Sequence, residues 1–338
     1  MKTQTTALWF KRIVLLSALL AVCVVGLGAY VRLSDAGLGC PDWPGCYGYM
    51  SVPESEAAIA QAQMIYPDSP VETHKAWKEM VHRYLAGILG LLILSLCVLG
   101  WCAKNSLRVS PWTPTVLLGL VIFQAALGMW TVTMLLKPAI VTAHLLGGMA
   151  TLAMLVWITH KHWGASSAQF LPVSLPRTLL RIAVVVLFLQ IMLGGWTSSN
   201  YAALACTDFP TCHGEWVPPM DFSNGFHWIR ELGEGLNGAP LTLEALTAIQ
   251  WTHRIGALIV LIYLGGLGVY LLKYAKLRVA SVALVMLLLV QIALGIANLL
   301  LHLPLVLAVA HNLVAALLLV TLVILNSKIT ESQAGRVS

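Results

Sequence analysis

Four histidines stand inside long apolar segments of this chain: His82, His144, His253 and His311. An imidazole among hydrocarbon side chains is energetically costly unless it is paired or coordinates something. Two neutral imidazoles at matching depth on parallel helices of one bundle can supply both axial ligands of a heme iron. We therefore expect the four histidines to hold two hemes. The alternative is that they form polar contacts between helices.

The second half of the chain repeats the first. VTAHLLGG around His144 corresponds to AVAHNLVA around His311, and MVHRYLAG around His82 corresponds to WTHRIGAL around His253. Because the matching histidines are 167 residues apart in the first of these comparisons and 171 in the second, they indicate a duplicated unit in which each copy carries one histidine pair. Nearby glycines would either let a flat ring approach the helix backbone or serve ordinary helix packing: Gly87, Gly147, Gly148 and Gly256.

Charged or amide side chains adjoin two of the histidines. Arg83 directly follows His82, and Arg254 directly follows His253. At these positions a guanidinium would either bind a heme propionate or extend to the lipid headgroups. Glu79 precedes His82 by three residues, and the matching residue of the second half is Gln250. Because residues i and i+3 share a helix face, Glu79 should point toward the rim of the group that His82 holds.

This difference between the halves suggests different roles for them. A carboxylate can take up a proton or stabilise developing positive charge, whereas a carboxamide cannot. We therefore expect the amino-terminal half to hold a reacting heme and the carboxy-terminal half to hold a permanent electron-transfer heme. The alternative is that Glu79 is an interfacial acid near Lys75 and Lys78.

Two cysteine pairs share the same spacing. Cys40 and Cys46 lie in GCPDWPGC, and Cys206 and Cys212 lie in ACTDFPTC. Outside the membrane, where conditions are oxidising, each pair can close a small disulfide. A zinc site is the competing interpretation, but the spacing differs from the usual zinc pattern and only His213 adjoins either pair. A redox relay to a partner protein is a third possibility.

The composition excludes a water-soluble globular protein. Of 338 residues, 59% are hydrophobic and 10% are charged, with a mean hydropathy of +0.83, whereas soluble domains carry roughly 25% charged residues. The net charge is +6, but the basic residues are dispersed at the ends of apolar runs, so we expect no nucleic-acid partner. Eight apolar segments are long enough to cross the ~30 Å core of a bilayer: residues 12–32, 80–101, 113–134, 139–159, 179–199, 249–272, 279–300 and 305–326.

The distribution of charge predicts the orientation of these segments. Basic residues gather on the side of the membrane that holds both termini, and we expect this side to be cytoplasmic; they include Lys104, Arg108, Lys161, Lys273 and Arg336. Residues 33–78 and 200–248 then lie outside. The first apolar segment could pass for a signal peptide, but it is long and lacks a convincing cleavage site, so we expect a helix.

The expected fold is an all-α integral membrane protein of eight transmembrane helices. It consists of two tandem four-helix bundles, residues 1–165 and 166–338. Since each unit crosses the membrane an even number of times, the copies share one orientation and should be related by a pseudo-two-fold along the membrane normal. No Arg- and Ser-rich transit segment precedes the first helix, which favours the bacterial cell (inner) membrane.

Six motifs follow one another over nearly the whole chain: GCPDWPGCYG, EMVHR, VTAHLLGG, CTDFPTCHG, QWTHR and AVAHN. Together they resemble the bacterial heme A synthase family. The resemblance implies oxidation of a ring methyl of heme O to a formyl group by successive hydroxylations, giving heme A for terminal oxidases. It also implies these residue roles: substrate-heme ligands His82 and His144, an essential acid Glu79, heme b ligands His253 and His311, and an outer-loop disulfide of Cys40 and Cys46, with Cys206 and Cys212 pairing in part of the family.

The resemblance also implies partners. Heme b would be the cofactor, heme O the substrate and the lipid bilayer the surroundings, with heme O synthase, an electron acceptor and a second copy of the chain as possible protein partners. Two other functions fit the same residues: a diheme membrane cytochrome that exchanges electrons with quinone, and a non-enzymatic heme carrier. The long first outer segment, which contains AAIAQAQMIY, would either cover the site or dock a partner.

Overall fold

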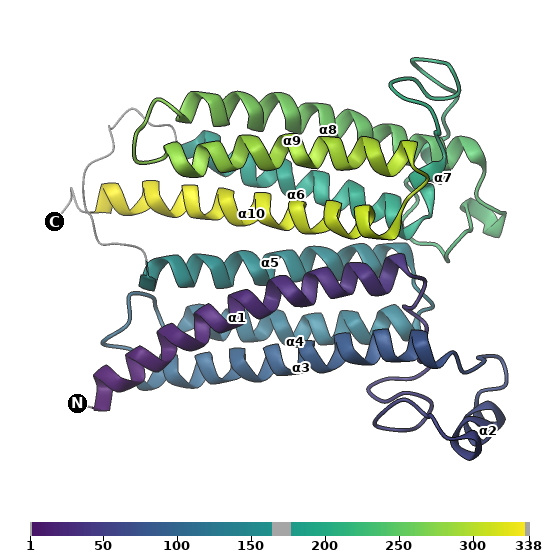
Figure 1. The fold of residues 1–338 in the computed structure, drawn as a ribbon, viewed down its shortest axis with the longest axis horizontal. Coiled ribbons are helices and arrows are strands. Elements are labelled where there is room, and N and C mark those ends of the chain that lie inside the picture. Colours follow the sequence, from purple (N-terminus) through teal and green to yellow (C-terminus); the bar gives the residue numbers. More distant parts are fainter. Residues whose placement is uncertain (1, 164–176, 335–338) are drawn as a thin grey trace.

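The computed structural model describes residues 2–163 and 177–334, and this part of the chain is helical (Figure 1). Eight of its helices are long and apolar enough to cross a membrane, which confirms the predicted fold class. They are α1 (Lys2–Leu33), α3 (Thr73–Cys102), α4 (Trp112–Thr133), α5 (Pro138–Trp163), α6 (Arg177–Ser199), α8 (Leu243–Leu271), α9 (Arg278–Leu300) and α10 (Leu305–Ala334). The shorter helices are α2 (Glu56–Ile65), α7 (Phe222–Gly225), η1 (Ala202–Leu204) and η2 (Leu236–Gly238).

Two of the histidine-bearing helices begin earlier than hydropathy predicts. α3 begins at Thr73 instead of residue 80, and α8 begins at Leu243 instead of residue 249. The first turn of α3 is polar, so a hydropathy pattern does not register it. The first turn of α8, LEAL, holds a single charged residue, and Thr242 caps this helix through its side-chain oxygen, which favours a helix start. His82 and His253 therefore lie roughly two to three turns inside their helices instead of at the start.

Each half of the chain forms a ring of four contacting helices. In the first half α1 contacts α3, α3 contacts α4, α4 contacts α5, and α5 contacts α1. In the second half α6, α8, α9 and α10 contact one another in the corresponding cycle. Figure 1 shows the two bundles side by side, with their helices running along the long axis of the molecule. The structure thus contains two four-helix bundles, and the pseudo-two-fold that would relate them stays a prediction.

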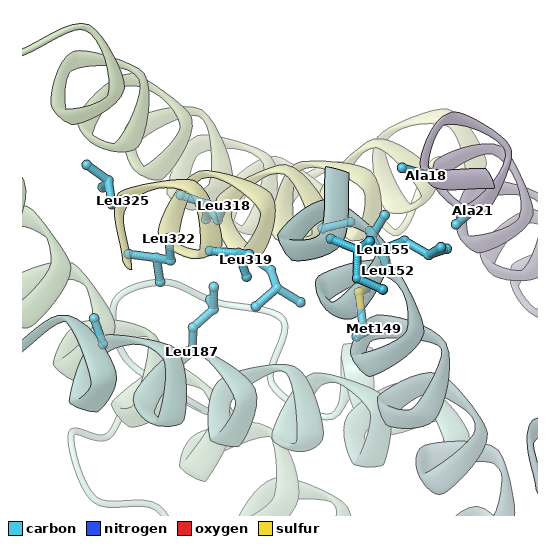
Figure 2. Packing of buried hydrophobic residues seen from close by; sticks show 14 of the residues in the cluster. Ala18, Ala21, Met149, Leu152, Leu155, Leu187, Leu318, Leu319, Leu322 and Leu325 are labelled. Carbon is cyan, nitrogen blue, oxygen red and sulfur yellow. The ribbon is translucent and has the colours of Figure 1, made fainter. Parts of the chain in front are cut away.

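Apolar side chains of α1, α5, α6 and α10 pack where the two bundles meet (Figure 2). Ala18, Leu152, Leu187 and Leu319 are buried there, and α5 contacts both α6 and α10. Since lipid tails are as apolar as these side chains, close packing is what holds such helices together. Phe10 of α1 is fully buried, so α1 packs against the other helices of its bundle, as expected of the first membrane helix.

The ends of the helices agree with the predicted grouping of the loops. α1 begins and α10 ends at one end of the molecule, whereas α2 and α7, which belong to the two predicted outer segments, lie at the opposite end (Figure 1). The predicted boundary between the units at residues 165 and 166 falls outside the described residues, as does Arg336.

Candidate functional site

The histidines of each half approach one another inside their bundle. His82 of α3 and His144 of α5 lie within range of a direct electrostatic interaction with each other. His253 of α8 and His311 of α10 interact in the same way. Each pair therefore consists of two side chains that come from different helices of the same bundle.

Each of the four imidazoles lies against a glycine of a neighbouring helix. A Cβ added to this glycine would lie 3.0 to 3.3 Å from the ring Cε1 atom, closer than ordinary van der Waals contact. The pairs are Gly28 of α1 with His82, Gly128 of α4 with His144, Gly194 of α6 with His253, and Gly295 of α9 with His311. The glycines therefore provide the space in which the rings are positioned.

Three of the four imidazole rings contain a buried nitrogen atom without a hydrogen-bond partner among the described residues. Nδ1 of His82, His144 and His311 is buried and has no hydrogen-bond partner within the described part of the chain. Buried polar atoms normally have a partner, so three unpartnered imidazole nitrogens at repeated positions require an explanation. Two neutral imidazoles per bundle are a donor set that suits a heme iron, and the residues present therefore fit such a group.

Replacing Gly194 with Ala should displace the His253 imidazole, because the new methyl group would lie 3.2 Å from the ring Cε1 atom. We expect the amount of low-spin heme per protein to fall, as measured by absorption and electron paramagnetic resonance. Gly266→Ala is the control, since a Cβ at this position of α8 meets open space. Equal low-spin heme in the two variants would show that Gly194 does not position the ring.

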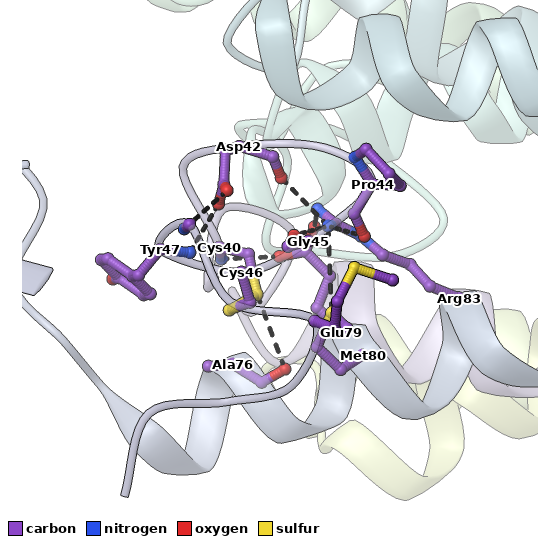
Figure 3. Close-up of a disulfide and its surroundings, with 12 residues drawn as sticks. Cys40, Asp42, Pro44, Gly45, Cys46, Tyr47, Ala76, Glu79, Met80 and Arg83 are labelled. Carbon is purple, nitrogen blue, oxygen red and sulfur yellow. Dashed lines mark hydrogen bonds and ion pairs between the residues drawn. A yellow bond between two sulfur atoms is a disulfide. The ribbon is translucent and has the colours of Figure 1, made fainter. Parts of the chain in front are cut away.

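Glu79 is buried beneath the loop that carries the first disulfide. The residue is 4% exposed, and its Oε2 atom accepts a hydrogen bond from the Cys40 N–H at 3.0 Å. Its other oxygen forms an ion pair with Arg83, one turn further along α3. Figure 3 shows Glu79 and Arg83 reaching from the helix toward this loop. Of the two lysines near Glu79 in the sequence, Lys75 pairs with Glu72, and the ion pair of Glu79 is with Arg83.

Gln250 occupies the same position in the second half. Its Oε1 atom accepts a hydrogen bond from the Cys206 N–H at 2.5 Å, and its Nε2 atom donates to the Ala203 carbonyl at 2.5 Å. Glu79 and Gln250 therefore share one structural task, which is to hold the first cysteine of the loop. They differ in charge, and only Glu79 forms an ion pair with the arginine that follows it.

Both arginines bind carbonyl groups of the loop above them. Arg83 donates to the Asp42 carbonyl at 3.0 Å, and Arg254 donates to the Thr211 carbonyl at 2.8 Å and the Cys206 carbonyl at 3.0 Å. Their predicted contact with heme propionates stays a prediction, and their observed task is to fix the loops to α3 and α8.

The loops themselves have the same construction in both halves. The structure joins Cys40 to Cys46 and Cys206 to Cys212 as disulfides. His213 lies beside the second cysteine pair. The sulfur atoms of Cys206 and Cys212 are bonded to each other, so they offer no thiolate ligand for the zinc site considered above.

An aspartate stabilises the turn within each loop. Asp42 accepts hydrogen bonds from the Gly48 N–H at 2.8 Å, and Asp208 accepts from the Gly214 N–H at 3.0 Å. Hydrogen bonds from Thr211, the largest cause, and from backbone N–H groups hold the pKa of Asp208 well below its usual value of 3.8. Because the folded pKa is lowered, this stabilisation is present above pH 3.8 and is lost as the pH falls toward the folded value.

Sequence reasoning missed part of this arrangement. Gly28 and Gly194 were not singled out, although they lie at equivalent positions of the two repeats. Gly147 and Gly256, which were singled out, contact the glutamines Gln124 and Gln190 instead of an imidazole. A repeated spacing could have identified the correct glycines. Gln190 precedes Gly194 by four residues, and the same spacing separates Gln124 from Gly128 and Gln291 from Gly295.

Comparisons with known proteins identify relatives along the whole chain. Residues 11–323 match a family model described as cytochrome oxidase assembly protein. A heme A synthase of Shewanella oneidensis is 44% identical over 321 residues, which covers 94% of this chain and 95% of the relative. A heme A synthase of Methylobacterium radiotolerans is 30% identical over 326 residues, which covers 88% of this chain and 84% of the relative. The similarity thus extends over both bundles and both disulfide loops.

Proposed function

The chain belongs to the cytochrome oxidase assembly protein family, and from this membership we propose that it is a heme A synthase of the bacterial cell membrane. The observation that carries the proposal is the similarity to heme A synthases over both halves, together with one imidazole pair inside each bundle. The reaction is oxidation of a ring methyl of heme O to a formyl group. The product, heme A, serves terminal oxidases.

The amino-terminal bundle is the proposed substrate site. His82 and His144 hold the iron of heme O between α3 and α5, and their contacts with Gly28 and Gly128 support this role by fixing where the rings lie. Heme O enters and heme A leaves in each reaction cycle. The two histidines therefore need to bind the iron and also to release it.

The carboxy-terminal bundle is the proposed site of the resident heme b, held by His253 and His311. A heme at this position supplies a route for the electrons that methyl oxidation removes in pairs. The protein contributes the two imidazoles and apolar surroundings, which together hold the group and limit contact with water. An electron acceptor is the corresponding partner.

Glu79 is the proposed proton-handling group of the reacting half. Among the residues whose side chains the structure describes, it is the only buried carboxylate. It precedes His82 by three residues, so the two share one face of α3. Arg83 and the Cys40 N–H hold the carboxylate in place, and a carboxylate so held can accept or return a proton during oxidation of the methyl group.

The membrane orientation is part of the same proposal. Both termini lie in the cytoplasm, and the disulfide loops lie outside, where oxidising conditions preserve the two bonds. Helix α2 lies in the first outer segment, between α1 and α3. It is therefore a candidate to cover the substrate site or to contact a heme O synthase. Assembly into a homo-oligomer remains part of the proposal.

Pigment extraction tests the proposed function. The chain is produced in cells that make heme O but have no heme A, and extracted hemes are separated and identified by mass and absorption. We expect a formyl-bearing heme only when both the chain and heme O are present. Two bound hemes with unmodified substituents would instead indicate a diheme cytochrome, and reversible binding of unmodified heme would indicate a carrier.

A further inference from the structure

The surface of the protein is hollowed where a helix of the first bundle, α5, meets a helix of the second, α6. One open cavity of about 290 Å³ is lined by side chains of these two helices, and another of about 250 Å³ is lined by side chains of α5, α6 and α10. Val184 of α6 lines both cavities, so the two adjoin. Together they form a groove along the seam between the bundles, which we call the seam groove.

The seam groove has the polarity and the length of a fatty acyl chain. Its lining side chains are apolar or aromatic apart from Asn326, whose amide already donates to the Leu180 and Leu322 carbonyls. On α5 the groove runs from Leu146 to Trp157, a rise of ~16 Å. One leaflet of a bilayer contributes ~15 Å of hydrocarbon. A single acyl chain therefore fits along the groove.

Basic residues from both bundles stand at one end of the seam groove. Lys161 of α5 follows Trp157 by one turn, and its Nζ atom lies 6.0 Å from the centre of the Trp157 ring. On α6, Arg177 and Arg181 precede Val185 at intervals of four residues and therefore share its helix face. This is the end of the molecule at which α1 begins and α10 ends (Figure 1).

The sequence around these cations supplies almost no negative charge. Residues 80–207, which include α5 and α6, contain no aspartate and no glutamate, and α10 contains only Glu331. A further cation is close by, because Arg108 donates a hydrogen bond to the Lys161 carbonyl at 3.3 Å. The excess of positive charge at the end of an apolar groove is complementary to a molecule that has an acyl chain and an anionic headgroup.

We propose that the seam groove is a binding site for an anionic phospholipid. One acyl chain lies between α5 and α6, and Lys161, Arg177 and Arg181 bind the phosphate group. Basic pockets between membrane helices are places where anionic headgroups bind. Because its ligands come from both bundles, the lipid joins the two halves of the protein at the end opposite the disulfide loops. This site is separate from the histidine pairs and does not depend on the proposed function.

Native mass spectrometry of the purified protein, titrated with phosphatidylglycerol or with phosphatidylcholine of the same acyl chains, tests the headgroup site. We expect wild type to bind phosphatidylglycerol more tightly, and Arg181→Gln to weaken this binding roughly 5-fold, the usual effect of removing one cation near a headgroup. Arg278→Gln is the matched control, because Arg278 begins α9 at the same end of the molecule, and α9 does not line the groove. It should bind as wild type does.

The acyl-chain part of the site is tested by Val184→Phe, whose larger ring fills the point where the two cavities adjoin. It should weaken phosphatidylglycerol binding severalfold, whereas Val282→Phe, on the exposed surface of α9, should not. A single symmetrical peak in size-exclusion chromatography shows that each variant is folded. Equal affinity of wild type for the two lipids, or equal loss in Arg181→Gln and Arg278→Gln, would overturn the inference. So would a quinone or a second copy of the chain found in place of the lipid.

Discussion

Replacing Glu79 with Gln should abolish heme A formation while leaving the bound hemes and the fold intact. Gln250 shows that a glutamine at this position can hold the loop, since it accepts the same hydrogen bond from the first cysteine. The substitution therefore removes the charge and the proton acceptor but keeps the hydrogen bond. Loss of a general acid or base typically slows a reaction by ~10²–10⁴-fold.

The measurement is quantification of heme O, partly oxidised intermediates and heme A in extracts of Glu79→Gln and of a control variant. Glu72→Gln is a suitable control because it makes the same change in an exposed carboxylate that pairs with Lys75 before α3. We expect the control to form heme A as wild type does and Glu79→Gln to accumulate heme O or an intermediate. Undiminished heme A in Glu79→Gln would remove this carboxylate from the mechanism.

Replacing His253 or His311 with Ala should eliminate the low-spin signal of the carboxy-terminal heme. In the proposed site His253 and His311 would together hold the heme iron, so the loss of either imidazole would remove one of the two protein ligands. We expect heme b content to fall severalfold, and heme A formation to fall with it because the electrons from the methyl group lose their route.

Absorption and electron paramagnetic resonance spectra of the purified variants provide this measurement. His74→Ala is the control, since His74 lies on the first turn of α3 and its side chain is 68% exposed. It should retain the wild-type spectrum. A bis-imidazole spectrum that survives in both His253→Ala and His311→Ala would mean that the ligands are elsewhere.

Much of the fold could be predicted from the sequence because membrane-spanning helices carry a strong signal. A run of apolar residues long enough to cross hydrocarbon has few other interpretations. The duplicated histidine motifs predicted one imidazole pair in each bundle, which is where the proposed heme sites lie. The start of α3 is later in the hydropathy pattern because the first turn of this helix is polar, and hydropathy does not separate a polar helical turn from a loop. The start of α8 depends on the Thr242 cap, which a hydropathy pattern does not record.

The detailed contacts of the site were harder to predict. Which glycine faces an imidazole depends on how each helix is rotated about its axis, and apolar residues all around a membrane helix do not specify this rotation. Gly28 was missed for this reason, whereas Gly147 was noticed because it lies near a histidine in the sequence. The engagement of Arg83 by loop carbonyls was likewise not predictable, because it depends on the folded course of residues 40–48.

Cryo-electron microscopy of the purified, heme-loaded protein tests the central claim most directly. We expect density for one iron between the imidazoles of His253 and His311, and, after addition of heme O, for a second iron between His82 and His144. Iron bound to other side chains, or imidazoles turned outward to the lipid in either bundle, would contradict this account.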